Sequence, residues 1–461
     1  SKGNFSKAKE IYETLLKKNP NDLAVLENYG ALLSQTKDFK KAEDIFKKCL
    51  EIKPEDPILL YNFGKLFHDQ KIFDKAIKLY EKSFGINPKN NFSMYNIGNI
   101  YLLSGKFEKA ISAFKKSIEI NPENFLAHNN LALAYKNTGN FNDSLKSYKN
   151  AIAKNENYVD GHVNYSTQLL MLEKFKEGFE EYEWRKKSKS FSDYINYSKL
   201  NLKSKVWNGE ALDNKKLFVI AEQGIGDLIQ FTRHLYLLKK KYKVEIILYV
   251  KSKKFSHFFD KKRFKIISEG DTIPPHDYHN HLLSLLKVFL KDNNLFCKSV
   301  NFFQKNKETE EKWRSKLKKY KGPKIGINSL TSLSGKNIPM KYFMQLASNF
   351  DFNFIFLQKS INKSELKEIA NRKNLIYFSD IDSSDKAFVD SIEIIKNLDL
   401  IITADTSIAH VSATLEKNTW IPLPFVSDWR WFLDEKSSRW YDNVALYRSK
   451  KSIIGIFHFK Q

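Results

Sequence analysis

Apolar residues in the first part of the chain recur at helical spacing, in runs that come in pairs. One pair covers residues 95–103 and 107–120, with Ser104-Gly105-Lys106 between the two runs. Apolar side chains three and four residues apart line one face of a helix, and a short segment with glycine is typical of a turn. The pattern therefore predicts helix–turn–helix units.

These units repeat every 34 residues. Four prolines keep this period, at Pro20, Pro54, Pro88 and Pro122. Small residues form a second column, at Gly30, Gly64, Gly98, Ala132 and Ser166, and aromatic residues a third, at Tyr12, Phe46, Tyr80, Phe114, Tyr148 and Tyr182. Small residues let paired helices approach, aromatic rings fill the space between neighbours, and proline ends the second helix. The array resembles the tetratricopeptide repeat (TPR) family, and we expect a TPR superhelix over residues 1–187.

A column of side-chain amides follows the same period, at Asn28, Asn62, Asn96, Asn130 and Asn164. An aligned row of amides offers donors and acceptors at regular intervals, which suits binding the backbone of an extended peptide. The row is similar to the asparagine ladder of O-linked N-acetylglucosamine transferases. The alternative is that these amides bond only within the array. Ser1 falls in the second helix of a unit, so part of the native protein is expected to precede it.

The pattern changes after a polar stretch, residues 188–213, which we interpret as a linker or cap. An apolar run at 217–221 is followed by a turn containing glycine and a helical stretch at 228–240. Further runs typical of strands lie at 244–250, 264–267, 324–328, 352–357, 375–378, 400–403 and 419–423, and helical stretches at 341–349, 364–372, 388–397 and 407–415. The alternation predicts an α/β region of two Rossmann-like lobes, 214–320 and 321–461, with the basic helical segment 309–321 at their boundary; a single large lobe is the alternative.

Composition narrows the classes of function. The 461 residues carry a formal charge of +24, and 42% are hydrophobic, but no apolar run reaches the length of a membrane span. Only eight of the 77 basic residues are Arg, and the lysines are spread along the sequence, so we expect no nucleic-acid partner. Cys49 and Cys297 are too few for a disulfide framework, which favours a reducing, cytoplasmic location.

Ligands of α/β sheets bind beyond the carboxyl ends of the strands, which directs attention to the loops there. In the loop after 217–221, Gly224 and Gly226 would let a substrate approach the backbone. Asp227 is a candidate general base for an acceptor hydroxyl, or alternatively a residue that only caps the helix.

Two further loops carry groups that suit an anion. Asp405, Thr406, Ser407 and His410 lie at the start of a helix, where free amides favour a nucleotide diphosphate. The alternative is an ordinary N-cap and a histidine satisfied in the core. Lys336 lies in a loop containing glycine and is a candidate to neutralise a leaving phosphate, although lysine is abundant throughout the chain.

Several strings occur in order: Val206-Trp207-Asn208-Gly209-Glu210, Glu222-Gln223-Gly224-Ile225-Gly226-Asp227, Asp405 to His410, Asp428-Trp429-Arg430-Trp431 and Arg439-Trp440-Tyr441. Together they resemble bacterial TPR-containing glycosyltransferases with a heptosyltransferase-like GT-B catalytic domain, some of which are implicated in glycosylating flagellin. The resemblance covers essentially the whole chain.

The resemblance implies a role for each matching residue. Asp227 matches the catalytic base of heptosyltransferases, and Lys336 the lysine that meets the donor phosphate, although Ile338 replaces a Trp there. Asp405, Thr406 and His410 match a donor-binding segment. By the same resemblance, Gln358 is placed to contact the nucleotide base, and Arg430 to shape the donor pocket or the interface between the lobes.

The function expected from this resemblance is metal-independent transfer of a sugar from a nucleotide sugar to a hydroxyl of a polypeptide, with flagellin as one candidate acceptor. The array would recruit the acceptor. No metal or other cofactor is expected, and the clustered His276, His279 and His281 lack the Cys or carboxylate spacing of a zinc site. Two alternatives stay open: a non-catalytic TPR scaffold with a degenerate glycosyltransferase domain, and an enzyme whose acceptor is a glycan.

Overall fold

The computed structural model describes residues 2–189, 191, 200, 202–329, 337–433 and 435–450. The chain divides into two compact units, residues 1–161 and 162–461. None of the described helices is long and apolar enough to cross a membrane.

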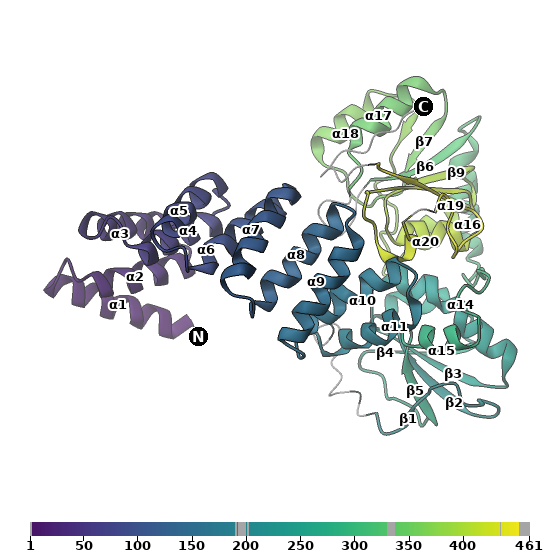
Figure 1. Cartoon of the computed structure of the whole chain (residues 1–461). Coiled ribbons are helices and arrows are strands. Elements are labelled where there is room, and N and C mark those ends of the chain that lie inside the picture. The colour runs from purple at the N-terminus through teal and green to yellow at the C-terminus, as the bar shows by residue number, and fades with distance from the viewer. Residues whose placement is uncertain are drawn as a thin grey trace. The chain divides into compact units, whose positions relative to one another are not determined.

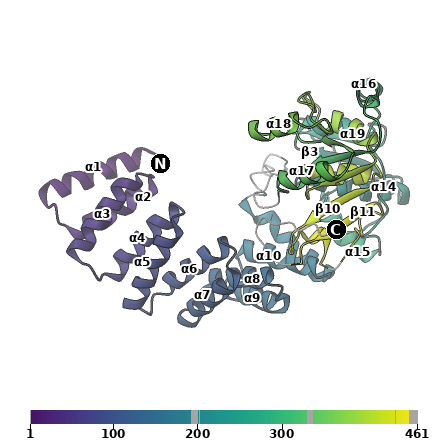
Figure 2. The same ribbon diagram turned by 90° about the horizontal axis from the view of Figure 1, so that it is seen from above.

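The first unit is a stack of antiparallel helix pairs, as Figures 1 and 2 show. Its helices are α1 (Lys2–Lys18), α2 (Leu23–Gln35), α3 (Phe39–Ile52), α4 (Pro57–Asp69), α5 (Phe73–Ile86), α6 (Asn91–Leu103), α7 (Phe107–Ile120), α8 (Phe125–Asn137) and α9 (Phe141–Lys154). Four of them begin at a side-chain cap that itself repeats every 34 residues, at Asp22, Asp56, Asn90 and Asn124. Each cap oxygen accepts a backbone amide of the first turn, so the period marks where the first helix of a unit starts.

The small and aromatic columns meet in the core of this unit. Phe46, Tyr80 and Phe114 are at most 1% exposed. A Cβ added at Gly64 would lie 2.9 Å from the ring of Tyr80, and one at Gly98 only 2.6 Å from that of Phe114. The predicted close approach of paired helices at the small column is confirmed.

Two more helices of the repeat pattern follow, α10 (Val159–Met171), in which the second unit starts at His162, and α11 (Phe175–Tyr182). The 3-10 turn η1 (Glu183–Lys187) continues α11. Two parallel sheets follow. The first contains β1 (Lys205–Val206), β2 (Lys216–Ile220), β3 (Glu245–Val250), β4 (Phe264–Ser268) and β5 (Tyr278–His281), with α14 (Ile225–Lys241), η2 (Lys253–Phe258) and α15 (Leu285–Lys291) between or after the strands.

The second sheet contains β6 (Lys324–Asn328), β7 (Asn353–Phe356), β8 (Leu375–Ile376), β9 (Leu400–Thr403), β10 (Thr419–Leu423) and β11 (Val444–Arg448). Its helices are α16 (Lys307–Lys318), α17 (Met340–Asn349), α18 (Lys363–Ala370), α19 (Val389–Lys396) and α20 (Ser407–Thr414), with a 3-10 turn, η3 (Trp429–Trp431). The strands are short, apolar and flanked by helices, which is the composition of a sheet buried on both faces.

Both sheets reverse their strand order. The second runs β8-β7-β6-β9-β10-β11, so the chain builds outward from β6 in one direction and then from β9 in the other. The first runs β4-β3-β2-β5-β1, with its reversal between β2 and β5. Open α/β sheets bind ligands in the crevice at such a reversal, beyond the carboxyl ends of the two strands.

Every strand that the sequence predicts is present, and β1, β5, β11 and α15 are additional. β5 was missed because its residues, Tyr278 to His281, do not form an apolar run. Asn280 is nevertheless buried, and its amide donates to the Trp207 carbonyl at 2.8 Å. β1 lies within residues 188–213, whose polar composition predicts a linker or cap.

Candidate functional site

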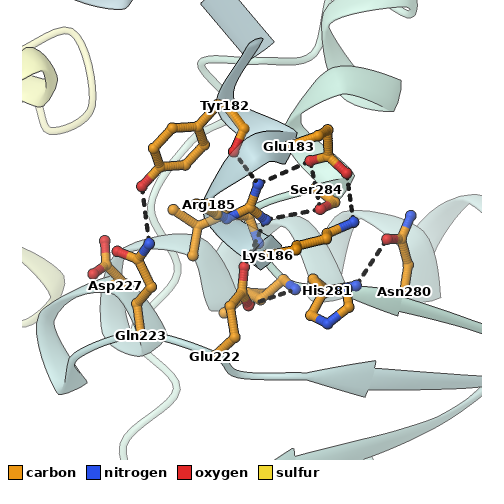
Figure 3. A network of polar contacts seen from close by, with 12 residues as sticks. Tyr182, Glu183, Arg185, Lys186, Glu222, Gln223, Asp227, Asn280, His281 and Ser284 are labelled. Atoms are coloured by element: carbon orange, nitrogen blue, oxygen red, sulfur yellow. Dashed lines mark hydrogen bonds and ion pairs between the residues drawn. The ribbon is translucent and has the colours of Figure 1, made fainter. Parts of the chain in front are cut away.

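The loop that follows β2 is fixed by a buried carboxylate. Glu222 is 2% exposed, and it accepts hydrogen bonds from Arg185 Nη2 at 2.8 Å and from the backbone amides of Leu282 at 3.1 Å and Leu283 at 3.3 Å. These amides follow β5, the neighbour of β2. One side chain therefore joins the carboxyl ends of both strands at the reversal to the end of the repeat helices (Figure 3).

Arg185 is the centre of this network. Its guanidinium also donates to Glu183 Oε1, to Ser284 Oγ and to the carbonyl of Tyr182, at 2.8, 2.8 and 2.9 Å. Burial alone would raise the pKa of Glu183, but the charges of Arg185 and Lys186 outweigh burial and hold this pKa at about 2. The loop that leads to Asp227 thus rests on a charged, hydrogen-bonded support.

Asp227 lies in the first turn of α14. The helix is capped by Gly224, which has no side-chain capping bond, and the Asp227 carboxylate instead forms an ion pair with Arg430 of η3. Its side chain is 16% exposed. Burial raises the pKa of Asp227 to about 6; Arg430 opposes this rise, and the charge of Asp428 adds to it.

Arg430 lies between two carboxylates. It bonds Asp227 through Nη2 and Asp428 Oδ1 through Nη1, the latter at 2.7 Å, and its guanidinium carbon lies 4.6 Å from the centre of the Trp429 ring. Asp227 lies on α14, which follows β2 of the first sheet, and Arg430 follows β10 of the second. The ion pair consequently joins the two halves of the α/β region, which is one of the two roles expected for Arg430.

The next residue, Trp431, organises the loop at the start of α20. Its Nε1 donates to Asp405 Oδ1 at 2.9 Å, and its ring stacks on His410 with a centroid distance of 5.6 Å. His410 is buried, and its Nδ1 lies 3.1 Å from the Tyr441 hydroxyl. Burial lowers the pKa of His410 to about 3, so the ring is neutral near pH 7.

Gly226 has a packing role. A Cβ at this position would lie 2.9 Å from Cδ2 of His410, so the missing side chain allows α14 to pack closely on α20. At Gly224, by contrast, an added Cβ would have no neighbour within 4 Å. Of the two glycines, only Gly224 leaves open space beside the backbone.

A second group of polar residues lies at the reversal of the second sheet. Asn328 ends β6, and its side-chain amide donates to the hydroxyl of Thr403, the last residue of β9, at 3.2 Å. It also donates to the hydroxyl of Thr406, three residues further on, at 3.1 Å. Thr406 caps α20 by accepting the amide of Ile408, and Ser407 is the first residue of the helix. The sequence predicted Thr406 and Ser407 here but missed Asn328.

Gln358, two residues beyond β7, extends this group along the sheet edge. Its Oε1 accepts the amide and the hydroxyl of Ser329, at 3.0 and 2.8 Å. Its Nε2 is buried and has no hydrogen-bond partner within the described part of the chain. Lys336 lies outside the described residues, so its predicted role stays a prediction.

The asparagine column lies in both units, and none of its side chains is fully buried. Asn96 donates to the Tyr61 hydroxyl at 3.0 Å, and Asn130 to Asn99 Oδ1 at 2.8 Å and to the Tyr95 hydroxyl at 3.3 Å. Asn28 bonds the Ala24 carbonyl of its own helix. Some of these amides therefore bond within the array, as the alternative interpretation expects, and their binding of a peptide stays a prediction.

Two of the three histidines considered as zinc ligands bond other groups of the chain. His279 bonds Ser204, His276 bonds the Pro274 carbonyl, and His281 lies at the end of β5. Within the described ranges, no three His, Cys, Asp or Glu residues are grouped to hold a metal ion.

Sequence reasoning missed the supporting residues: Arg185, Glu222, Ser284, Asn328 and Trp431 as a hydrogen-bond donor. A signal was present only for Glu222 and Trp431, which belong to the strings that carry the family resemblance. Two partners of Arg185, Glu222 and Ser284, lie 37 and 99 residues away from it, a separation for which the pattern of a single sequence gives no indication.

Comparison with solved structures finds TPR proteins. A crystal structure of MamA is 26% identical, with 34% of this chain and 93% of MamA covered and a TM-score of 0.32. YrrB, described as a TPR protein with an unusual peptide-binding site, is 16% identical over 42% of this chain and 99% of its own, with a TM-score of 0.33. A TPR protein from Parabacteroides merdae is 20% identical over 40% and 72%, with a TM-score of 0.35.

No curated protein matches the sequence. Family models described as tetratricopeptide repeat match residues 1–61, 58–90 and 128–162, and one described as TPR repeat matches residues 98–139. The N-terminal region is therefore an array of tetratricopeptide repeats, a type of scaffold for protein–protein interaction.

Proposed function

We propose that the chain is a nucleotide-sugar-dependent glycosyltransferase of the GT-B type whose TPR array selects a polypeptide acceptor. The observation that carries the proposal is the position of two groups of polar residues at the two sheet reversals. Asp227 lies at the reversal of the first sheet, and Asn328 and Thr406 at that of the second. The Asp428–Trp431 segment pairs with Asp227 through Arg430, and through Trp431 it donates a hydrogen bond to Asp405, which directly precedes Thr406.

The second sheet would bind the donor. Backbone amides at the start of α20, with the Thr406 and Ser407 hydroxyls, suit a diphosphate. The unbonded Nε2 of Gln358 suits an acceptor atom on the base. Lys336 and Asp405 complete the set that the family resemblance implies, and the chemistry requires no metal.

Asp227 would act as the base. A carboxylate with a pKa near 6 is largely ionised at neutral pH and accepts a proton better than one with an ordinary pKa. The acceptor hydroxyl loses its proton to Asp227 as its oxygen attacks the anomeric carbon, and the nucleoside diphosphate leaves with the electron pair of the broken bond. Arg430, paired with Asp227, opposes the effect of burial and favours the ionised form of the base.

A second candidate function is a non-catalytic TPR scaffold, and two observations favour it. The Asp227 carboxylate is already paired with Arg430, and α14 packs closely on α20 at Gly226. Both contacts stabilise the α/β region without a bound substrate, as a non-catalytic scaffold requires.

Thermal unfolding with UDP, GDP, ADP, CMP and their common sugar conjugates separates the two functions. A ligand at about 100 times its dissociation constant adds roughly 2.7 kcal/mol of stability. We expect one nucleotide to stabilise the wild type and the Thr138→Val control but not Thr406→Val, which lacks the hydroxyl at the start of α20. Stabilisation by none of the nucleotides would refute the donor site and favour the scaffold.

Catalysis needs a separate readout. With the stabilising sugar nucleotide, we expect Asp227→Asn to keep the thermal shift and lose transfer of the sugar to protein. Transfer that continues in Asp227→Asn would exclude this carboxylate as the base.

A further inference from the structure

A basic cleft lies at the edge of the first sheet opposite to Asp227. It has a volume of about 680 Å³, within the range of ligand pockets. Its walls come from the amino ends of β2, β3 and β4 and from the carboxyl end of α14. Because Asp227 follows the carboxyl end of β2, the cleft is separate from the proposed catalytic site.

Charge is concentrated in this cleft. Eight of its 14 lining residues are basic and one is acidic: Lys215, Lys216, Lys239, Lys243, Lys261, Lys262, Arg263 and Lys265, against Glu245. Over the whole chain the ratio of basic to acidic residues is only 77 to 53. The lysines look scattered in the sequence, but the segments that enter three parallel strands come together beside the carboxyl end of α14.

The cleft continues into a second cavity of about 540 Å³, with which it shares Lys239 and Arg263. Arg233, Lys240 and Lys298 add further positive charge there, and none of the residues lining this cavity is acidic. We call these two adjoining cavities the basic groove.

The chain's own carboxylates neutralise only part of this charge. Lys215 pairs with Asp277, Lys216 with Glu245 and Arg263 with Asp260. The other five basic residues of the cleft have no carboxylate within ion-pair distance in the part of the chain that the structure describes: Lys239, Lys243, Lys261, Lys262 and Lys265. Like charges that line one cleft repel one another, and a bound anion relieves that repulsion.

We propose that this groove binds an anion that carries several phosphate groups. A phosphate monoester carries about 1.5 to 2 negative charges at neutral pH, so roughly three such groups neutralise the five lysines. Carboxylates carry one charge each and would need about five groups in the same volume. Lysine binds phosphate as a point charge, whereas base recognition in nucleic acids relies on arginine and exposed aromatic stacking. The two tyrosines of the groove, Tyr236 and Tyr242, are each partly covered by a cation.

The proposal is tested by measuring the affinity of the full chain for inorganic tripolyphosphate. Isothermal titration calorimetry gives this affinity at low and at raised salt. The variant Lys243→Ala/Lys261→Ala/Lys262→Ala removes three exposed charges from the groove. Its matched control, Lys78→Ala/Lys82→Ala/Lys89→Ala, removes three exposed lysines from the first unit, so net charge falls equally. We expect binding that weakens with salt, roughly tenfold weaker affinity in the groove variant, and little change in the control.

All six lysines are exposed, so their replacement is not expected to disturb folding, and unchanged melting temperatures will show that both variants fold. A loss of binding then reports on the groove and not on misfolding. No binding of tripolyphosphate, or equal weakening in both variants, overturns the proposal. A single-stranded RNA that binds more tightly than tripolyphosphate through the same lysines also overturns it, in favour of nucleic acid. Sedimentation with vesicles of phosphatidylcholine and a phosphoinositide identifies the source: capture that depends on the groove lysines indicates a lipid headgroup, and tripolyphosphate binding without capture indicates a soluble phosphate.

Discussion

The change Asp227→Asn tests which force dominates at the centre of the candidate site. Burial raises the pKa of Asp227 from 3.8 to about 6, in spite of the ion pair with Arg430. The pKa of this carboxyl is higher in the folded than in the unfolded state, so its protonation favours folding. Its contribution to stability is complete below about pH 4, where the carboxyl is protonated in both states. This contribution is lost as the pH rises through about 6. Two pKa units correspond to about 3 kcal/mol, and an asparagine, which does not ionise, lacks this pH dependence.

Urea unfolding followed by tryptophan fluorescence measures the effect. All seven tryptophans lie between Trp184 and Trp440, so the signal reports on the second unit alone. We expect the free energy of unfolding of Asp227→Asn, relative to wild type, to rise by about 3 kcal/mol from about pH 4 to pH 7. The control Asp277→Asn should give a flat difference over this range, because backbone bonding by Lys216 lowers the pKa of Asp277 and moves its titration to more acidic pH.

A flat difference for Asp227→Asn, or one that falls with rising pH, would refute this reasoning. It would mean that the Arg430 ion pair outweighs burial and that the pKa of Asp227 is not raised. The proposed base would then be a weaker proton acceptor than the chemistry requires.

Two further changes test the supports of the fold. Arg185→Met leaves the buried Glu222 carboxylate without its cation and should cost the second unit about 3 to 5 kcal/mol by the same fluorescence assay, whereas Lys186→Met, which alters a half-buried partner of Glu183, should cost less. Gly98→Ala should destabilise the first unit by about 1 to 3 kcal/mol in far-UV circular dichroism, because its Cβ meets Phe114 at 2.6 Å. Gly30→Ala, at 3.1 Å from Phe46, should be close to neutral; equal effects of the two would contradict the packing argument.

The elements of the fold could be predicted because their signals are local. Each repeat carries its own proline, small residue and aromatic residue at fixed positions, and β2, β9 and β10 are apolar runs bounded by turns. β5 could not be predicted in this way, since its sequence Tyr-His-Asn-His becomes a strand only by pairing with β2 and β1. Strand order is likewise absent from the local pattern, although it decides which loops meet.

The residues of the candidate site likewise fall into those that local sequence indicates and those that only the fold brings together. Residues in characteristic strings, such as Asp227 and Thr406, could be singled out because their types and positions suit chemistry at a helix start. Their pairing with partners could not be predicted from the sequence, because Arg430 lies 203 residues from Asp227 and Asn328 lies 78 residues from Thr406. Only the packing of α14 on α20 and the adjacency of β6 and β9 bring these pairs together.

The contacts of Tyr182 connect the last repeat helix to the candidate site. Tyr182 ends α11, its hydroxyl accepts a hydrogen bond from Gln223 at 3.0 Å, and its ring lies 6.3 Å from that of Trp429. Gln223 precedes Gly224 and the turn that carries Asp227, while Trp429 precedes Arg430. A repeat helix thus contacts the neighbours of both members of the ion pair. Displacement of α11 would change the position of Asp227 relative to Arg430, and because burial and this cation set the pKa of the carboxylate in opposite directions, it would also change its basicity.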